Sequence, residues 1–282
     1  MSKENKKEKK HSFRKFLFFI LLFIILTVLY SRYLGTKGLL VKEYEIENNK
    51  LPHSFNNLKI AHFSDLHYGR TTDLNDVKEL VRRINLKKVD IIIFSGDLFD
   101  KSYNVNQKDI ENITNELKKL NSTYGSFYVN GEDDLKTQNF DNIMNESNFI
   151  SIIDKNEEII SKNNEKISLT GIGYNSNSID FLSKLNEYNY KIFVIHKPDD
   201  FDDYKAYNFS LALSGHSHNN QINIPYIKAF YSQNGSKKYY EPYYKIDNTD
   251  FYISSGIGTS DYSFRFFNRP SFSIYKIKDS LN

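Results

Sequence analysis

Histidine or carboxylate side chains stand directly after five of the short apolar runs in this sequence. Imidazole and carboxylate groups suit Zn, Fe and Mn, and a carboxylate can bridge two ions about 3.5 to 4 Å apart. Residues two apart in an extended loop, such as Asp65 and His67, project toward the same side. The residue types therefore predict a site for divalent metal ions. Its candidate ligands are Asp65, His67, Asp97, His196, His216 and His218.

Each of these residues has an ordinary structural interpretation when it is taken alone. Asp-x-His and Gly-Asp sequences are common in turns, and a single histidine is more often a hydrogen-bonded structural residue than a ligand. Four of the seven histidines, however, stand at predicted strand ends beside carboxylates. Random placement of turn residues does not explain this coincidence, so we favour a metal site.

The apolar runs alternate with segments of helical spacing, which predicts a layered α/β fold. Strands are expected at LKIAHFSD, VDIIIFSGD and SFYVNGED, and helices at 74–88 and 107–120 between them. A second set of strands with less helix between them is expected at KISLTGIGY, YKIFVIH, FSLALSGH, DFYISSGI and FSIYKIK. In such sheets, ligands bind outside the carboxyl ends of the strands, which is where the candidate residues stand.

Five motifs resemble, in order and spacing, those of the calcineurin-like metallophosphoesterases. They are SDLHYG (64–69), SGDLFD (95–100), NGEDD (130–134), HKP (196–198) and GHSH (215–218). The later segments QINIP (221–225) and ISSGIGTS…FRFFNRP (253–270) are similar to the membrane-associated bacterial branch of that family. The resemblance covers about residues 56–278 and implies a four-layer α/β/β/α sandwich.

The same resemblance implies a role for each candidate residue and a reaction. Asp65, His67 and His218 would hold one metal ion, His196 and His216 would hold the other, and Asp97 would bridge them. The implied reaction is hydrolysis of a phosphomonoester, phosphodiester or pyrophosphate bond by a hydroxide that bridges two divalent ions, Mn, Fe or Zn. Two such ions lower the pKa of a bound water and neutralise charge on the leaving oxygen.

The chain departs from the family pattern at residues 131–134. Glu132 stands where the family has an asparagine ligand, and Asp133 where it has the histidine that assists the leaving group. Glu132 can still bind a metal ion, more tightly but with reduced Lewis acidity. A carboxylate beside two cations is a poor proton donor, so Asp133 is expected to be a weak catalytic acid. The alternative function is therefore a metal- or phosphate-binding sensor or scaffold that has lost turnover.

An uncharged apolar segment precedes the predicted domain. Residues 16–30 read FLFFILLFIILTVLY, and the residues up to 34 extend this segment to the ~17 that a membrane-spanning helix needs. Basic residues precede it and no small-residue cleavage site follows it, which favours an uncleaved anchor over a buried helix or a signal peptide. The positive-inside rule then predicts a cytoplasmic N-terminus and an extracytoplasmic catalytic domain. We expect a basic tail at 1–15, an anchor at 16–34, a linker and lead-in strand at 35–55, and a metallophosphoesterase domain at 56–282.

Composition and charge exclude several other classes of protein. The chain has no cysteine, which rules out disulfides, thiol catalysis and cysteine-ligated metal. Residues 1–15 contain seven Lys/Arg and two Glu, which leaves 31 basic and 33 acidic residues, a net charge of −2, in the rest. A nucleic-acid binder carries its basic excess on the folded part, so no nucleic acid is expected. The expected partners are a small or lipid-linked phosphorylated substrate and the membrane bilayer.

Two further groups of residues leave their interpretation open. The tyrosines at 239, 240, 243 and 244 could form a patch near membrane headgroups or pack on the sheet. Arg265 and Arg269 could reach a phosphate, although the sequence Asn268-Arg269-Pro270 favours a turn before the last strand.

Overall fold

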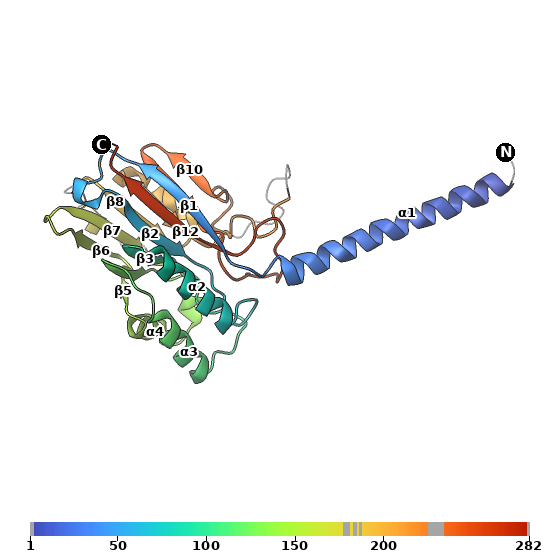
Figure 1. Ribbon diagram of the computed structural model, residues 1–282, viewed down its shortest axis with the longest axis horizontal. Coiled ribbons are helices and arrows are strands. Elements are labelled where there is room, and N and C mark those ends of the chain that lie inside the picture. Colours follow the sequence, from blue (N-terminus) through green and yellow to red (C-terminus); the bar gives the residue numbers. More distant parts are fainter. Residues whose placement is uncertain (1–2, 177–180, 183–184, 186–187, 225–233, 281–282) are drawn as a thin grey trace.

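The computed structural model describes residues 3–176, 181–182, 185, 188–224 and 234–280. Two six-stranded sheets lie face to face, with helices on the outer face of the first (Figure 1). The strand orders are β1-β12-β2-β3-β4-β5 and β10-β11-β9-β8-β7-β6. This architecture is the layered α/β sandwich that the sequence predicts.

The first sheet is built from the first five strands of the chain and from the last strand. Strands β2 to β5 are parallel, β12 is antiparallel to β2, and β1 lies parallel to β12 at the sheet edge. The strands are β1 (Leu40–Glu47), β2 (Leu58–Phe63), β3 (Ile91–Phe94), β4 (Gly125–Tyr128), β5 (Phe149–Ser151) and β12 (Ser271–Lys278). Ile91 and Ile93 face the second sheet, whereas Ile92 and Phe94 pack beneath the helices, as the alternation of side chains along a strand requires.

Three α-helices cover the outer face of the first sheet: α2 (Leu74–Lys87), α3 (Gln107–Leu117) and α4 (Phe140–Glu146). Helices α2 and α3 each begin with a capping box, in which two side chains satisfy backbone N–H groups that the helix leaves unpaired. The residues are Asp73 with Asp76, and Asn106 with Asp109. These caps fix where the loops that follow β2 and β3 end.

The second sheet has a parallel centre and two antiparallel edges. Its strands are β6 (Lys155–Ile160), β7 (Lys166–Ile172), β8 (Lys191–Ile195), β9 (Leu211–Ser214), β10 (Tyr243–Ile246) and β11 (Thr249–Ile253). Within the described ranges, the short 3-10 helices Pro198–Asp203 and Lys205–Tyr207 cover its outer face. Tyr239 is buried there against Phe251, with ring centroids 5.6 Å apart, so this tyrosine packs on the sheet, whereas Tyr243 on β10 is 42% exposed.

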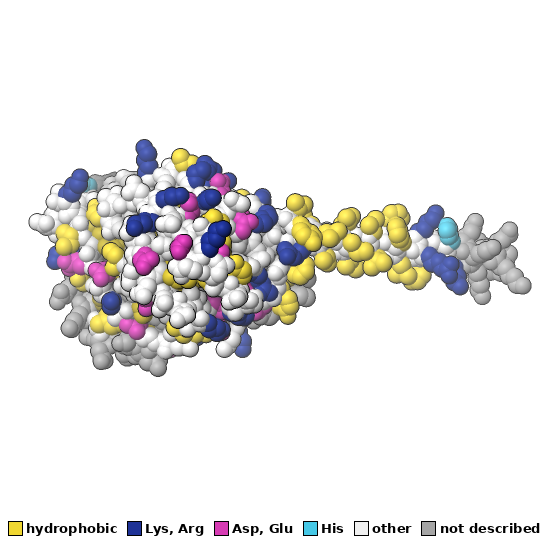
Figure 2. Space-filling model, turned by 90° about the horizontal axis from the view of Figure 1, so that it is seen from below, with side chains coloured by type: hydrophobic (Ala, Val, Ile, Leu, Met, Phe, Trp, Pro, Cys, Tyr) yellow, Lys and Arg dark blue, Asp and Glu magenta, His cyan; other side chains and the backbone are white. Residues whose placement is uncertain are grey.

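The N-terminal helix α1 (Lys3–Leu29) continues into a π-helical turn (Tyr30–Leu34) and projects away from the two sheets (Figure 1). The segment Lys10–Leu34 is long and apolar enough to cross a membrane, and none of its apolar window is buried. Figure 2 shows hydrophobic side chains along this helix between the body of the protein and a group of Lys and Arg side chains. The chain therefore has the N-terminal apolar helix that its sequence predicts.

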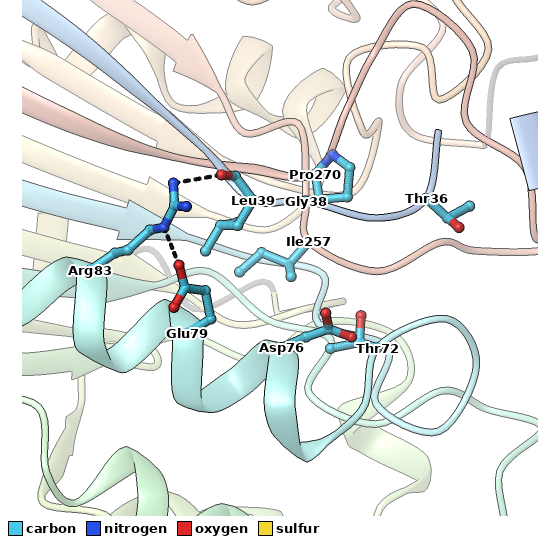
Figure 3. Close-up of a pocket in the computed structure, with 9 residues that line it drawn as sticks. All are labelled: Thr36, Gly38, Leu39, Thr72, Asp76, Glu79, Arg83, Ile257 and Pro270. Carbon is cyan, nitrogen blue, oxygen red and sulfur yellow. Dashed lines mark hydrogen bonds and ion pairs between the residues drawn. The ribbon is translucent and has the colours of Figure 1, made fainter. Parts of the chain in front are cut away.

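The residues just after the π-helical turn are hydrogen-bonded to helix α2. Lys37 donates a hydrogen bond from Nζ to Asp76 Oδ2 at 2.8 Å, and Arg83 donates from Nη1 to Leu39 O at 2.7 Å. Figure 3 shows Arg83 of α2 reaching Leu39 beside a small cavity that Pro270 also lines. Residues 36–39 therefore belong to the folded body of the protein.

We expect Ile93→Ala to lower the free energy of unfolding by about 2 to 5 kcal/mol, because it leaves a cavity between the two sheets. Ile93 is fully buried there. Urea denaturation of the detergent-solubilised chain, followed by circular dichroism, measures the change. The matched control is Ile160→Ala on β6, whose side chain is 48% exposed and whose loss should cost less than about 0.5 kcal/mol. Equal losses in the two variants would contradict this packing.

Candidate metal centre

Two triads of buried side chains meet at the carboxyl ends of the central strands of both sheets. The loops after β2 and β3 supply Asp65, His67 and Asp97, and the loops after β8 and β9 supply His196, His216 and His218. The potential ligand atoms of Asp65, His67 and His218 lie within 4.8 Å of one another, as do those of Asp97, His196 and His216. The structure thus brings together all six residues that the sequence places at strand ends.

Asp97 belongs to the second triad and also faces His67 of the first. Its Oδ2 is 3.2 Å from Nε2 of His196 and 3.7 Å from Nε2 of His67. Its Oδ1 accepts a hydrogen bond from the backbone N–H of Asp133 at 2.9 Å. A carboxylate in such a position has the geometry to bridge two ions.

The imidazole nitrogens of the triads provide a test of whether the site fits metal ions. Nε2 of His196, Nε2 of His218 and both ring nitrogens of His67 are buried without an aligned hydrogen bond. Buried polar atoms in folded proteins are normally paired, and an unpaired one costs about 1 to 3 kcal/mol. Divalent cations would satisfy these nitrogens together with the carboxylates beside them, and this donor set suits Zn, Fe or Mn. The residues therefore fit a pair of metal ions.

In each of two histidines, a hydrogen bond to a backbone carbonyl uses one ring nitrogen and leaves the other to face the metal site. His196 donates a hydrogen bond from Nδ1 to Ser95 O at 2.6 Å, which directs its other ring nitrogen, Nε2, toward Asp97. His216 donates from Nε2 to Asn234 O at 2.8 Å, which leaves the lone pair on Nδ1. Such partners orient a metal-binding imidazole and fix its tautomer.

Burial and pairing act against each other on the ionisable groups of the site. Burial lowers the pKa of His196, but Asp97 raises this pKa overall to about 10. Burial raises the pKa of Asp97, yet His196 holds it well below its usual range. Burial, together with repulsion from His196, lowers the pKa of His216 to about 4. His196 and Asp97 therefore stabilise each other's charged forms.

Two further carboxylates lie on the other side of His67. Its Nδ1 is 3.3 Å from Asp133 Oδ2 and 3.8 Å from Asp100 Oδ2. Burial lowers the pKa of His67, but the carboxylates around it, that of Asp133 above all, raise this pKa overall. Asp133 also accepts the backbone N–H of Lys101 at 3.1 Å, and Asp100 pairs with Arg70 at 3.3 Å. Asp100 stands in the SGDLFD motif, although sequence reasoning gave it no role.

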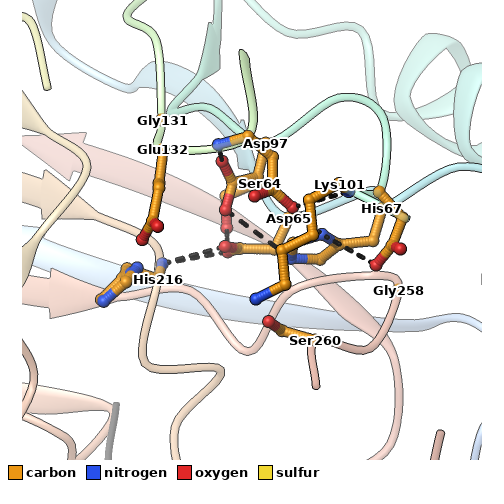
Figure 4. A network of polar contacts seen from close by, with 12 residues as sticks. Ser64, Asp65, His67, Asp97, Lys101, Gly131, Glu132, His216, Gly258 and Ser260 are labelled. Atoms are coloured by element: carbon orange, nitrogen blue, oxygen red, sulfur yellow. Dashed lines mark hydrogen bonds and ion pairs between the residues drawn. The ribbon is translucent and has the colours of Figure 1, made fainter. Parts of the chain in front are cut away.

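Glu132 lies beside the two triads and belongs to neither. Its side chain is 43% exposed, and its Oε1 is 3.5 Å from Nζ of Lys136. In Figure 4 it is directed toward His216. Its role as a metal ligand stays a prediction.

The backbone of the site loops takes conformations that are unfavourable for ordinary residues. Five of the candidate ligands have positive φ angles, between 38° and 65°, where a side chain crowds its own backbone. They are Asp65, His67, Asp97, His216 and His218. Glycine allows neighbouring loops to approach them, since a Cβ on Gly131 would lie 2.3 Å from Asp97 Oδ1.

Asp134 joins two loops of the site through their backbones. Its carboxylate accepts the N–H groups of Asp97 at 2.7 Å, Leu98 at 2.8 Å and Gly131 at 2.8 Å. Burial, with the nearby charge of Asp97, raises the pKa of Asp134 to about 7. Asp134 thus sets the position of Asp97, a function that the NGEDD motif does not reveal.

Arg265 closes the side of the site behind His218. It is fully buried and donates hydrogen bonds to the carbonyls of Gly258, Ser255 and Asn268 at 2.6, 2.8 and 3.3 Å. Its Nη2 is 3.2 Å from His218 Nδ1, and burial lowers its pKa to about 9. These contacts make Arg265 a support of the loop rather than a phosphate ligand.

We expect Asp134→Asn to lower the free energy of unfolding by about 1 to 3 kcal/mol, because an amide nitrogen cannot accept the buried N–H groups. Urea denaturation measures the effect. Asp247→Asn is the matched control, since Asp247 is exposed in the turn after β10. If the two variants are equally stable, the three N–H contacts do not hold the loops in place.

Comparisons with known proteins identify the family of this chain. The sequence profile described as calcineurin-like phosphoesterase matches residues 58–220. The chain is 28% identical over 260 residues to the uncharacterized metallophosphoesterase YkuE of Bacillus subtilis, covering 89% of this chain and 90% of that protein. It is 29% identical over 153 residues to a transmembrane protein with metallophosphoesterase domain of Bos taurus, covering 52% of this chain and 32% of that protein. The crystal structure of TT1561 of Thermus thermophilus matches with a TM-score of 0.47 and 13% identity, over 71% of this chain and 90% of that one. Because the profile match spans more than half of the 282 residues and contains both triads, the chain belongs to the calcineurin-like phosphoesterase family.

Proposed function

We propose that the protein is a membrane-anchored phosphoesterase that uses two divalent metal ions to hydrolyse a phosphomonoester, phosphodiester or pyrophosphate bond. The position of Asp97 carries the proposal, because its carboxylate faces an imidazole nitrogen of each triad, at 3.2 and 3.7 Å. Asp65, His67 and His218 would hold one ion, His196 and His216 would hold the other, and Asp97 would be shared. Glu132 is a further candidate ligand at the rim.

Two divalent ions at these triads would supply Lewis-acid stabilisation of phosphoryl charge and a hydroxide nucleophile at neutral pH. The contribution of the protein is to orient the ligands before the ions bind. The carbonyls of Ser95 and Asn234 hold His196 and His216 so that each presents its other ring nitrogen. Asp134 holds the Asp97 loop through three backbone N–H groups.

We assign Asp133 a positioning role in place of the proton-donor role that its place in the motif suggests. Its carboxylate faces Nδ1 of His67 at 3.3 Å and accepts the backbone N–H of Lys101. A carboxylate on Nδ1 of a metal-binding histidine orients the ring and favours the tautomer that leaves Nε2 free to bind. Since Asp133 is used as an acceptor, the enzyme should favour substrates whose leaving groups are weak bases.

The helix α1 supports the membrane part of the proposal. The segment Lys10–Leu34, which runs from α1 through the π-helical turn, buries none of its apolar window in the protein, as a helix in lipid does. The basic residues before this segment favour a cytoplasmic N-terminus, which would put the catalytic domain outside, near a small or lipid-linked phosphorylated substrate. Segments 221–225 and 253–270 favour the membrane-associated bacterial branch of the family, although Pro225 lies outside the described residues. The net charge of −2 after residue 15 argues against a nucleic-acid substrate.

We expect the full chain, purified in detergent and supplied with Mn, Fe or Zn, to bind two ions and to hydrolyse an aryl phosphodiester. Asp97→Asn removes the shared carboxylate and His216→Ala removes an imidazole, so each should reduce metal content and lower turnover more than about 100-fold. Elemental analysis gives the number of ions per chain, and release of the aryl alcohol gives the rate.

The control for these variants is His53→Ala, since His53 is exposed and lies outside both triads. It should keep the metal content and the rate of the natural chain. Full activity with unchanged metal in Asp97→Asn would refute the two-ion site. Two bound ions without hydrolysis of any activated ester would favour the sensor or scaffold function.

We expect Asp133→Asn to weaken metal binding by about 10- to 100-fold, because the ring of His67 loses the carboxylate that orients it. Titration with Mn²⁺ and a competing chelator measures the affinity, and Asp133→Glu should restore part of it. The slope of log rate against leaving-group pKa should not change. A steeper slope with unchanged metal affinity would show instead that Asp133 donates a proton.

A further inference from the structure

A group of aromatic side chains lies beside the end of α1, in the part of the chain that follows the family match. Residues 262–267 read YSFRFF and are called here the aromatic segment. Tyr262 is 54% exposed and Phe267 is 66% exposed. The ring of Phe267 lies 4.3 Å from that of Phe266, and an exposed cluster of large apolar side chains usually marks an interaction surface. The metal centre described above does not account for their exposure.

The aromatic segment is bonded directly to the end of the helix. The backbone N–H of Arg265 donates to Ser31 O at 3.0 Å. The rings of Tyr30 and Phe266 meet edge to face, with centroids 6.2 Å apart. Gly35 lies so close to the aromatic segment that a Cβ on it would be 2.0 Å from Arg265 O. Only glycine, which has no Cβ, avoids this clash. These contacts therefore hold the aromatic segment at a fixed position along the axis of the helix.

The apolar part of the helix ends at this position. The π-helical turn Tyr30–Leu34 exposes Tyr33 by 64% and Leu34 by 65%. Aromatic residues are enriched at the membrane–water interface, where an apolar ring and a polar tip are both accommodated. Tyr30 contacts Phe266, whose ring lies 4.3 Å from that of Phe267, so these three rings form such a group where the helix meets the body of the protein.

We propose that the aromatic segment docks into the surface of the bilayer that α1 crosses, beside the turn Tyr30–Leu34. This inference rests on the membrane anchoring in the proposed function. A bilayer is the occupant that the structure favours, because the exposed apolar surface of the segment is continuous with that of α1 through the contact of Tyr30 with Phe266.

The aromatic segment also supports the metal centre, which gives the docking a consequence for the substrate. Arg265 within the segment contacts Nδ1 of His218, and Asn268 just after it donates to the carbonyl of His218 at 2.6 Å. A docked segment would therefore hold the His218 side of the centre close to the layer of lipid headgroups. The substrate class that this arrangement fits is a phosphorylated lipid or a lipid-linked phosphate.

A single tryptophan tests the docking, because the natural chain contains none. Phe267→Trp is introduced into the full chain, which is reconstituted into vesicles of phosphatidylcholine and phosphatidylglycerol. Part of the phosphatidylcholine carries bromine on its acyl chains close to the headgroup, which quenches nearby tryptophan. We expect a roughly two-fold loss of emission relative to unbrominated vesicles, since docked side chains reach about 5 to 10 Å into the headgroup and acyl boundary.

Two matched variants serve as the positive and the negative control for this measurement. Phe23→Trp, at a side chain 70% exposed in the middle of the apolar helix, should be quenched when bromine lies deeper in the acyl chains. Ile160→Trp, at a side chain 48% exposed on the edge strand β6, should not be quenched in any vesicle. Hydrolysis is not part of the readout, so a failure of docking is separate from a failure of the phosphoesterase.

The outcomes distinguish the alternatives. If the Phe23→Trp variant is quenched and Phe267→Trp is no more quenched than Ile160→Trp, the anchoring stands and the docking is wrong. If the Phe23→Trp variant is not quenched, α1 does not cross the bilayer, and both the anchoring and the docking are wrong. A change in the emission of the Phe267→Trp variant that disappears when the chain is diluted in the vesicles would reveal contact between two copies, which also overturns docking to lipid.

Discussion

The burial of charged groups between the two sheets is the constraint on which the rest of the structure depends. Two carboxylates and four imidazoles lie at the carboxyl ends of the strands, all at least about nine-tenths buried. A buried charge is tolerated only when it is paired and hydrogen-bonded. Pairing of His196 with Asp97 provides part of this compensation, and backbone N–H groups provide another part, as for Asp65, which accepts the N–H of His216 at 3.0 Å.

Rigid surroundings keep these groups from turning toward solvent. The strands that precede them are buried on both faces: β2 and β3 lie between the α-helices and the second sheet, and β8 and β9 lie between the first sheet and the 3-10 helices. The loops then turn sharply through positive φ angles, which an isolated chain would rarely adopt. Asp134 and Arg265 hold these turns through backbone N–H groups and carbonyls, respectively. The strain in the loops is therefore balanced by contacts to the backbone as well as by the packed sheets.

Sequence alone predicts the central strands and the ligand candidates, because both leave a local signal. The run IIIF of β3 is followed directly by polar residues, and Asp97 stands where the strand ends. The edge strands β6 and β10 carry lysines, glutamates and tyrosines that are partly exposed, so their apolar signal is weak and the sequence does not predict them. The supporting roles of Asp100, Asp134 and Arg265 depend on contacts between distant loops, which local spacing does not encode. The contact between Asp133 and His67 also joins two loops that are far apart in the sequence. The position of Asp133 in its motif therefore suggests a different role from the one that its contacts indicate.

The pairing of β1 with β12 determines when the first sheet can be completed during synthesis. Leu40 pairs with Ser271, and β12 lies between β1 and β2, so the first sheet joins the beginning of the body to its end. Synthesis proceeds from the N-terminus, and contacts between residues so far apart in sequence form slowly. The ribosome must therefore have made residues up to 278 before β1 has its partner, and until then the edges of β1 and β2 are open to wrong strand pairing. Nascent chains of this protein thus carry unpaired edges on β1 and β2 for almost the whole of their translation.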